Sequence, residues 1–490
     1  MRTVAVGVAG ALLALGSASA CAHAPTAPPA APSTTYTATT TESAFLDTVS
    51  RRTFDWFWET TNPRNGLTPD RWPTKSFSSV AAVGFALTAY PIGVERGWIS
   101  RADALDRVRT TLRFFWTAPQ GDAPTGVTGS HGFYYHFLDM ETGRRFERVE
   151  LSTIDTSLLL GGVLVCREYF DRADSGEVEV RALADSIYRR VDWKWAENGR
   201  PLVSMGWHPE PGLPDHDAQG FIRTNWFGYT EGMILYALAL GSPTHPIDPS
   251  AWDAWTATYK WSTFEGQTFV QFAPLFGHQY SQLFVDYRGI RDAYMRGKGM
   301  DYFENSRRAA LSQRAYAVAN PGAWRDYSAD VWGLTASDGP LDSTFVVDGR
   351  ARTFHTYWAR GAGGDEINDD GTIAPTAAGG SVAFAPDVAI PALVAMRTRY
   401  GDDVFGRYGF VDAFNPTLRA PGPRFTQGRQ VPGKAWVDVD HLGIDQGPIL
   451  AMIENYRTGL VWRLMRKDPY IVRGLCRAGF TGGWLEGQCP

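Results

Sequence analysis

The sequence predicts an all-α fold, a toroid of six helical hairpins with long loops at one end. Apolar residues recur at helical spacing in one segment after another. Long connections rich in Gly, Pro and aromatic residues alternate with short ones, and about 36 residues per hairpin would place six pairs between residues 43 and 480. No composition shift follows residue 42, so residues 43–490 are predicted to form one domain.

The first helix is expected from about residue 43 to Thr60, because apolar side chains recur at helical spacing from Phe45 to Trp58. Ser100 and Asp103 form a capping box that opens a later helix. Further helices are predicted at 78–95, 100–116, 153–170, 175–197, 230–240, 291–318, 389–400 and 448–465. Short strands are predicted at 132–138 and 268–272.

The N-terminal residues resemble an export signal. Residues 1–20 combine Arg2, an apolar stretch too short to span a membrane comfortably, and small residues before Cys21. Ala-Ser-Ala-Cys loosely resembles a lipobox, which makes Cys21 a candidate for lipidation. Residues 21–42 are mostly Ala, Pro, Thr and Ser, a composition typical of a flexible linker. We expect an exported protein, periplasmic or anchored to the outer membrane as a lipoprotein.

Composition narrows the possible partners. A formal net charge of −5 without a basic stripe argues against nucleic acid. The 18 Trp residues indicate either a large core or a groove that stacks on sugar rings. The His residues show no zinc-binding spacing, so no catalytic metal and no cofactor are predicted. Cys166 is expected to be a buried thiol, whereas Cys476 and Cys489 could pair in an exported protein.

Glu231 is the strongest candidate for catalysis from the residues alone. It lies where an aromatic loop gives way to the apolar run 233–240, which predicts a buried helix. Trp226 and Tyr229 add flat apolar faces beside it, and apolar surroundings raise the pKa of a glutamate. The alternative is a first-turn glutamate favoured by the helix dipole.

Several motifs together resemble one family. They are Thr-Phe-Asp-Trp-Phe-Trp (53–58), Gly-Val-Glu-Arg-Gly-Trp-Ile-Ser (93–100), Ser-Thr-Ile-Asp-Thr-Ser-Leu-Leu-Leu-Gly-Gly-Val-Leu (152–164), Gly-Tyr-Thr-Glu (228–231), Gly-Ser-Pro-Thr-His (241–245), Trp-Gly-Leu-Thr-Ala-Ser-Asp-Gly-Pro (332–340), Asp-Gly-Thr-Ile-Ala-Pro-Thr-Ala-Ala (370–378), Asp-Gln-Gly-Pro-Ile (445–449) and Ile-Glu-Asn-Tyr-Arg-Thr-Gly (453–459). From about residue 43 to 480 the chain is similar to the glucoamylase-like domain family, which includes the β-1,2-glucanases of glycoside hydrolase family 144.

The resemblance implies an (α/α)6 barrel whose loops form a cleft for a β-linked glucan. It also implies hydrolysis with inversion, with Glu231 as general acid and Asp445 as general base. Inversion places the two carboxyl groups roughly 6.5 to 9.5 Å apart. Asp155, where family 144 enzymes carry Glu, is a third candidate. Asp445 could instead cap the helix that begins near residue 448, and Asp155 could close a capping box with Ser152.

The candidates for substrate binding are loop aromatics and polar residues that could meet sugar hydroxyls. They are Trp207, Trp226, Tyr229, Asp286, Arg288, Trp332, Asp338 and Asp370. Asp286 and Arg288 could also simply pair with each other. Asp338 and Asp370 precede Gly and could be turn residues.

The sequence therefore predicts an exported, monomeric glycoside hydrolase that acts on β-1,2-glucan, including sophorooligosaccharides. Two alternatives remain. The loops could select a different β-glucan or support a transglycosylase, since loops set substrate choice on a shared barrel. The protein could also be a glucan-binding lipoprotein without catalysis, whose membrane contact is a lipid at Cys21.

Overall fold

The computed structural model describes residues 36–419 and 424–489, and from Ala38 onward the chain forms one compact unit. The predicted signal peptide (1–20), Cys21 and most of the linker (21–42) lie outside the described residues. Within the described ranges, no helix combines the length and apolarity needed to cross a bilayer. The sulfurs of Cys476 and Cys489 are bonded, and Cys166 is a buried free thiol.

Helices supply most of the regular structure. They are α1 Thr40–Thr60, α2 Val80–Glu95, α3 Arg101–Thr117, α4 Thr153–Tyr169, α5 Ser175–Arg190, α6 Trp193–Glu197, α7 Gly232–Gly241, α8 Ser250–Thr256, α9 Tyr280–Phe284, α10 Ala293–Lys298, α11 Tyr302–Ala319, α12 Pro375–Gly379, α13 Pro386–Tyr400, α14 Gly443–Arg457, α15 Leu460–Met465 and α16 Pro469–Arg477. Three short 3₁₀ helices, Leu275–His278, Gly401–Asp403 and Gly483–Leu485, lie in the connections.

The strands are short and lie in the loops. They are β1 Arg71–Trp72, β2 Ser78–Ser79, β3 Gly129–Ser130, β4 Phe133–Tyr135, β5 Phe137–Leu138, β6 Leu151–Ser152, β7 Gly206–Trp207, β8 Trp261–Phe264, β9 Gln267–Val270, β10 Ala336–Ser337, β11 Ser343–Val347, β12 Arg350–Phe354, β13 Trp358–Ala359, β14 Gly361–Gly363, β15 Glu366–Asn368, β16 Phe405–Gly406, β17 Gly409–Phe410, β18 Phe414–Asn415, β19 Arg429–Val431, β20 Ala435–Val437 and β21 His441–Leu442. They pair antiparallel, mostly two at a time, and the largest sheet runs β3-β4-β6-β7.

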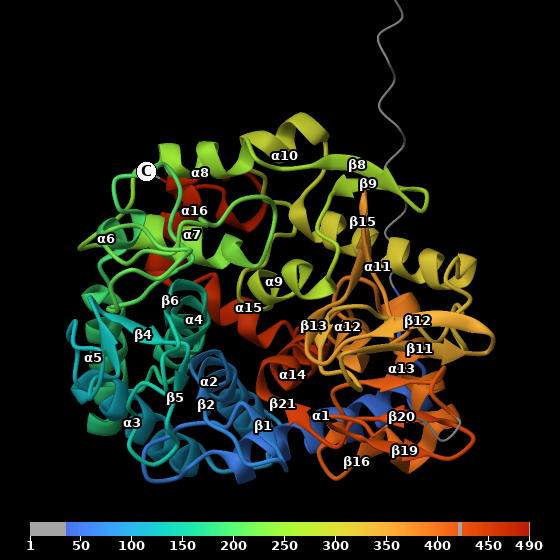
Figure 1. The fold of residues 1–490 in the computed structure, drawn as a ribbon. Helices are drawn as coiled ribbons and strands as arrows, with labels where there is room; N and C mark the ends of the chain where they lie inside the picture. The colour runs from blue at the N-terminus through green and yellow to red at the C-terminus, as the bar shows by residue number, and fades with distance from the viewer. Residues whose placement is uncertain (1–35, 420–423, 490) are drawn as a thin grey trace, which may run out of the picture. The chain divides into compact units, whose positions relative to one another are not determined.

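A closed circuit of packed helices surrounds the middle of this unit (Figure 1). Helix α2 packs against α4 and α14, α4 against α7, α7 against α9, and α9 back against α14, while α12 lies on α14. Helices α2 and α7 are apolar and buried around nearly their whole circumference, as expected for helices enclosed on every side. Helices α1, α5, α13 and α16 pack on this circuit from outside.

Helices α2 and α4 meet backbone to backbone. A Cβ atom built on Gly84 would lie 2.3 Å from the carbonyl oxygen of Leu158, and one on Gly162 would lie 2.0 Å from the carbonyl oxygen of Gly84. Only glycine fits at such a crossing. The crossing fixes α4, which carries Asp155 in its first turn, against α2.

Three long helices were predicted with the wrong boundaries. The segment 175–197 divides into α5 and α6, and 291–318 divides into α10 and α11 where Gly299 adopts a left-handed backbone. The segment 448–465 starts earlier, at Gly443, and breaks at Gly459, which is also left-handed. The predicted strands correspond to β4 with β5 and to β9. The expectation of an all-α fold misses the other strands, most of which have only two or three residues and are too short to show alternation.

Candidate active site

Glu231 occupies the N-cap position of α7, yet its side chain forms no capping hydrogen bond in the described structure. Its carbonyl oxygen accepts a hydrogen bond from Ser281 Oγ at 2.7 Å, which fixes the backbone. The side chain is 9% exposed, and within the described residues Oε2 has no hydrogen-bond partner. Burial raises the pKa of Glu231 to about 7, and the nearby Asp155 carboxyl adds to the increase. The group can therefore hold a proton near neutral pH.

A cavity of about 180 Å³ lies over this carboxyl group. Asp155 and His136 share its wall with Glu231, and three aromatic rings, Phe276, Tyr280 and Tyr357, close the rest together with aliphatic side chains. Tyr357 is 52% exposed, unlike the other two rings, and it offers a free aromatic face. An acid beside an accessible ring is the arrangement needed to hold and protonate a sugar.

Asp155 belongs to a small charged network. The hydroxyl of Ser152 donates to Asp155 Oδ2 and accepts a hydrogen bond from the Asp155 backbone amide, so Ser152 caps α4. His136 Nε2 lies 3.5 Å from Asp155 Oδ1, and its Nδ1 lies 2.7 Å from Glu150 Oε1. Burial lowers the pKa of His136, but the negative charges of Asp155 and Glu150 outweigh it and raise the pKa to about 9. An imidazolium therefore stands in the cavity wall.

Asp445 lies in the first turn of α14, where Leu442 is the N-cap, so the interpretation of Asp445 as a cap is wrong. Its side chain is 2% exposed, and neither carboxyl oxygen has a conventional hydrogen-bond partner among the described residues. Its neighbour Ile444 lines the cavity. Burial, then the charge of Asp445 and a smaller contribution from Glu231, raise the pKa of Tyr280. Tyr280 is therefore close to both predicted catalytic carboxyl groups.

Asp412, which the sequence analysis missed, is a second carboxyl group beside Asp445. Its Oδ2 accepts a hydrogen bond from the backbone amide of Asp338 at 2.7 Å, and Asp338 Oδ2 accepts from Arg71 Nη1 at 2.7 Å. Burial and the Asp338 carboxylate raise the pKa of Asp412 to about 7. Burial and then the charge of Asp412 raise the pKa of Asp445 well above its usual range. The two groups therefore titrate as a pair.

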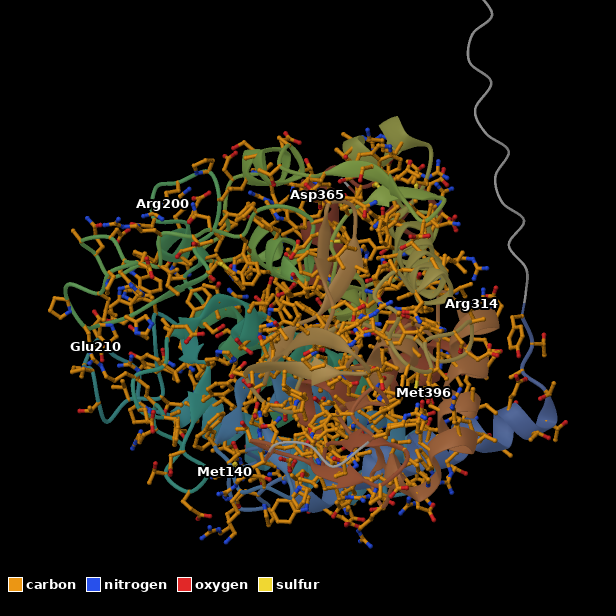
Figure 2. The ribbon with its side chains drawn as sticks, turned by 45° about the vertical axis from the view of Figure 1, so that its right-hand side comes forward. Met140, Arg200, Glu210, Arg314, Asp365 and Met396 are labelled. Carbon is orange, nitrogen blue, oxygen red and sulfur yellow. A yellow bond between two sulfur atoms is a disulfide. The ribbon has the colours of Figure 1, made fainter. Side chains whose placement is uncertain are left out.

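Two further cavities adjoin the first. One, of about 670 Å³, shares Tyr357 with it and is also lined by Arg71 and Asp338. The other, of about 330 Å³, is lined by Trp226, Tyr229 and the exposed Phe227, and by the turn between β14 and β15 at Asp365 (Figure 2). Thr230, which precedes Glu231 in the chain, also lines this third cavity.

The other predicted binding residues lie in packed surroundings. Trp332 is fully buried, so its ring has no face free for a sugar, and Trp207 is 8% exposed, with its indole nitrogen donating to the Gln219 carbonyl. Asp370 is buried in a two-point pair with Arg360. Asp286 pairs with Arg288 at 2.7 Å and also with Arg466, which supports the alternative that Asp286 and Arg288 pair with each other. None of these five residues lines the three cavities.

The pH dependence of stability can test the environment of Glu231. Because folding raises the pKa from 4.5 to about 7, the native state loses stability as pH rises through this window. Glu231→Gln removes this titration. We expect the variant to gain up to about 3 kcal/mol relative to wild type between pH 4 and pH 8, measured by chemical denaturation. The exposed Glu141→Gln is the control; an equal effect of Glu231→Gln at both pH values would contradict the assignment.

A glutamate whose pKa is raised to about 7 shares one cavity with an exposed aromatic ring, and a second buried carboxyl group lies nearby, which is an arrangement that a glycoside hydrolase needs. The family model described as "Putative glucoamylase" matches residues 223–469. The chain belongs to this family, as the resemblance of its motifs predicted.

Known proteins of similar sequence and structure support this placement. The chain is 31% identical to a solved structure described as a putative glucoamylase from Bacteroides fragilis, with 92% and 100% of the two chains covered and a TM-score of 0.74. For the endo-β-1,2-glucanase from Chitinophaga pinensis the identity is 28%, the coverage 90% and 99%, and the TM-score 0.74. An exo β-1,2-glucooligosaccharide sophorohydrolase (non-reducing end) from Parabacteroides distasonis is 29% identical over an alignment of 477 positions that covers 90% of this chain and 59% of that protein.

Proposed function

We propose that the protein hydrolyses β-1,2-glucan or its sophorooligosaccharides with inversion, using Glu231 as general acid and Asp445 as general base. The observation that carries this proposal is the buried carboxyl group of Glu231, whose Oε2 has no hydrogen-bond partner among the described residues and whose pKa is raised to about 7, close to the pH where an acid catalyst works. The relatives named for β-1,2-glucan or its oligosaccharides, at 28% and 29% identity, support the substrate.

The chemistry divides between the two carboxyl groups. In the proposed reaction, the proton of Glu231 passes to the leaving oxygen as the glycosidic bond breaks, and Asp445 accepts a proton from the attacking water. Asp445 can act as a base only after the pair with Asp412 has lost a proton. Burial and the charge of Asp412 raise the pKa of Asp445, so the basic form of Asp445 gains population as pH rises, whereas Glu231, with a pKa of about 7, loses its proton over the same range. Activity is therefore confined to a window around neutral pH.

The scaffold and the location are part of the same proposal. We interpret the circuit of α2, α4, α7, α9, α12 and α14 as the inner ring of an (α/α)6 toroid, with outer helices packed on it. The strand-bearing loops then form the cleft. Export, through the signal-like residues 1–20 and a lipid at Cys21, would bring the enzyme to extracytoplasmic glucan.

Reducing-end release and product chromatography on linear β-1,2-glucan test the substrate. We expect wild type to cleave it and to leave a β-1,3-glucan intact, and proton NMR of the first product should show the inverted anomer. Chain-length analysis then separates internal cleavage from release at a chain end. Cleavage of another glucan alone would remove the substrate assignment, and binding without cleavage of any glucan would favour a glucan-binding protein.

Tyr357 is expected to serve as a sugar platform, because its half-exposed ring lines two adjoining cavities. Tyr357→Ala should lower kcat/KM on the glucan about tenfold, mainly through KM, since a stacked ring contributes about 1 kcal/mol or more. Tyr357→Phe keeps the ring and should stay close to wild type. If the alanine variant has wild-type KM, the ring does not hold the substrate.

A further inference from the structure

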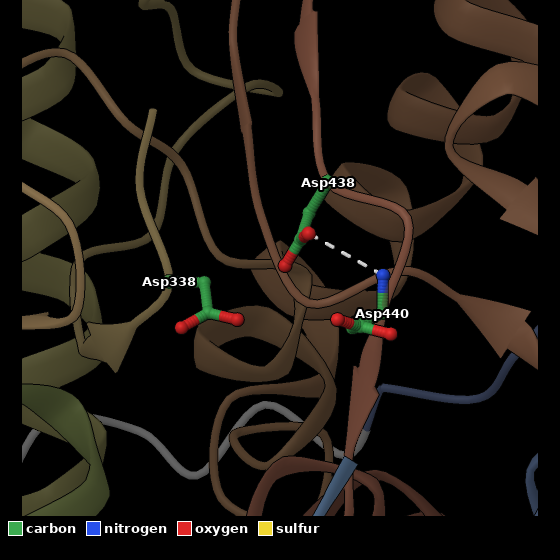
Figure 3. A group of neighbouring side chains, drawn as sticks. All are labelled: Asp338, Asp438 and Asp440. Atoms are coloured by element: carbon green, nitrogen blue, oxygen red, sulfur yellow. Dashed lines mark hydrogen bonds between the residues drawn. The ribbon is translucent and has the colours of Figure 1, made fainter. Parts of the chain in front are cut away.

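Three aspartates form a compact acidic cluster beside the largest of the three cavities: Asp338, Asp438 and Asp440. Each is at most 2% exposed. One carboxylate oxygen from each lies within 4.8 Å of the other two, and Figure 3 shows the three groups around one space. Asp338 follows β10, Asp438 follows β20, and Asp440 precedes β21, so the cluster joins segments about 100 residues apart.

Each carboxylate has one oxygen held by the protein. Asp338 Oδ2 accepts from Arg71 at 2.7 Å. Asp438 Oδ1 accepts from the backbone amide of Val439 at 2.7 Å, and Asp440 Oδ1 accepts from that of Thr74 at 2.8 Å. These bonds fix the orientation of all three groups before any ligand arrives.

Other oxygens in the cluster are left without donors. Asp338 Oδ1 and Asp438 Oδ2 are both fully buried, and the described residues offer neither of them a hydrogen bond. A buried carboxylate oxygen without a partner is costly in free energy, and a ligand or a proton relieves that cost. Two such oxygens on one small cluster are an observation separate from the proximity of the three residues.

Negative charges outnumber positive charges around the cluster. Arg71 is the one basic side chain that pairs with the cluster among the described residues, and it is shared with Asp70, from whose Oδ2 its Nε lies 3.1 Å. Asp412 adds a further carboxyl group, which binds the backbone amide of Asp338. One guanidinium therefore serves several buried carboxyl groups.

We propose that Asp338, Asp438 and Asp440 bind a calcium ion. All three donors are carboxylate oxygens, which hard cations prefer, whereas zinc and copper sites use nitrogen or sulfur. Two oxygens that share one calcium ion at about 2.4 Å can be at most about 4.8 Å apart, and the three oxygens of the cluster lie within this limit of one another. Calcium fits better than magnesium, because magnesium demands near-octahedral geometry and keeps several waters.

The ion would fix the start of α14 and thereby the position of Asp445. Strand β21 follows Asp440 directly and leads into α14, the helix that carries Asp445, while β21 pairs with β1 at Arg71. A cation bridging Asp338 to Asp438 and Asp440 would tie the start of α14 to the cavity wall. None of the three aspartates lines the cavity that holds Glu231, so this ion would be structural and does not replace the prediction of no catalytic metal.

Calorimetric titration of the chelator-treated, dialysed full chain with CaCl₂ tests the proposal without any glucan. We expect saturable binding of one ion with Kd at or below about 1 mM and a melting temperature raised by about 2 °C or more at saturation, with weaker binding of MgCl₂. Asp438→Asn should weaken calcium binding at least tenfold. Asp342→Asn, at an exposed position in the same cavity, should leave it unchanged.

Absence of both heat and a melting shift in wild type up to about 5 mM CaCl₂ would overturn the proposal. So would equal calcium affinity of wild type and Asp438→Asn. If Asp438→Asn does not fold, Asp338→Asn and the wild-type titration decide the question. Should calcium fail to bind while Asp438→Asn raises KM for glucan, the aspartates bind sugar hydroxyls instead. Because binding is read without substrate, it is independent of the proposed hydrolysis.

Discussion

Glu231→Gln is expected to lower kcat on β-1,2-glucan by about 10²- to 10⁴-fold, the range associated with loss of a general acid. Glutamine keeps the shape of the side chain but has no proton to give to the leaving oxygen. KM should change little, because the aromatic walls of the cavity remain. Reducing-end assays at saturating glucan measure the effect, and the remote Glu141→Gln should retain full activity.

The leaving group distinguishes an acid from a residue that only shapes the cavity. An aryl sophoroside with a good leaving group needs little protonation, so Glu231→Gln should lose much less activity on it than on glucan. Equal losses on both substrates would mean that Glu231 contributes structure or binding and not the proton.

Asp445→Asn is expected to remove a similar factor, about 10²-fold or more, because asparagine cannot accept a proton from water. Its partner supplies the more discriminating test. The charge of Asp412 raises the pKa of Asp445, so Asp412→Asn should let Asp445 ionise at a lower pH. The acidic limb of the profile of kcat/KM against pH should then move downward, by about 1 unit or more.

Asp412→Asn should retain much more activity than Asp445→Asn. A shift of the acidic limb of the pH profile would show that Asp412 acts on the ionisation of Asp445 and does not merely support the fold. An Asp412 that only supports the fold would lower protein stability and leave the pH profile in place. If Asp412→Asn abolishes activity at all pH values while Asp445→Asn does not, the base is Asp412.

The helices with a marked apolar pattern could be predicted because that pattern, a stripe or an unbroken apolar run, is present in residues that are neighbours in the sequence. Helix α7 and its junction with the loop at Glu231 are an example: ten apolar or small residues follow one acidic residue. The family resemblance of the motif at 445–449 pointed to Asp445, whereas its local pattern suggested a helix cap, and its position in the first turn of α14 became clear only once the helix start was seen at Gly443.

Asp412, His136 and Tyr357 could not be found in this way, because each lies in a loop or beside a two- or three-residue strand. Their significance comes from contacts with residues distant in the chain, such as Asp412 with Asp338. The sequence also cannot show which loop tryptophan is covered by the fold. Nothing in the sequence around Trp332 indicates that its ring is buried, yet in the structure its exposed fraction is 0%.

The backbone contact between α2 and α4 at Gly84 and Gly162 should tolerate far fewer substitutions than the loops around the cavities do. Gly84 and Gly162 have no room for any other side chain, so a library selected only for soluble protein should lose nearly every replacement at these positions. The loops that line the cavities are not part of this crossing of α2 and α4 and can change length while it stays intact. New glucan preferences would therefore arise by loop exchange, with the helix pair inherited unchanged.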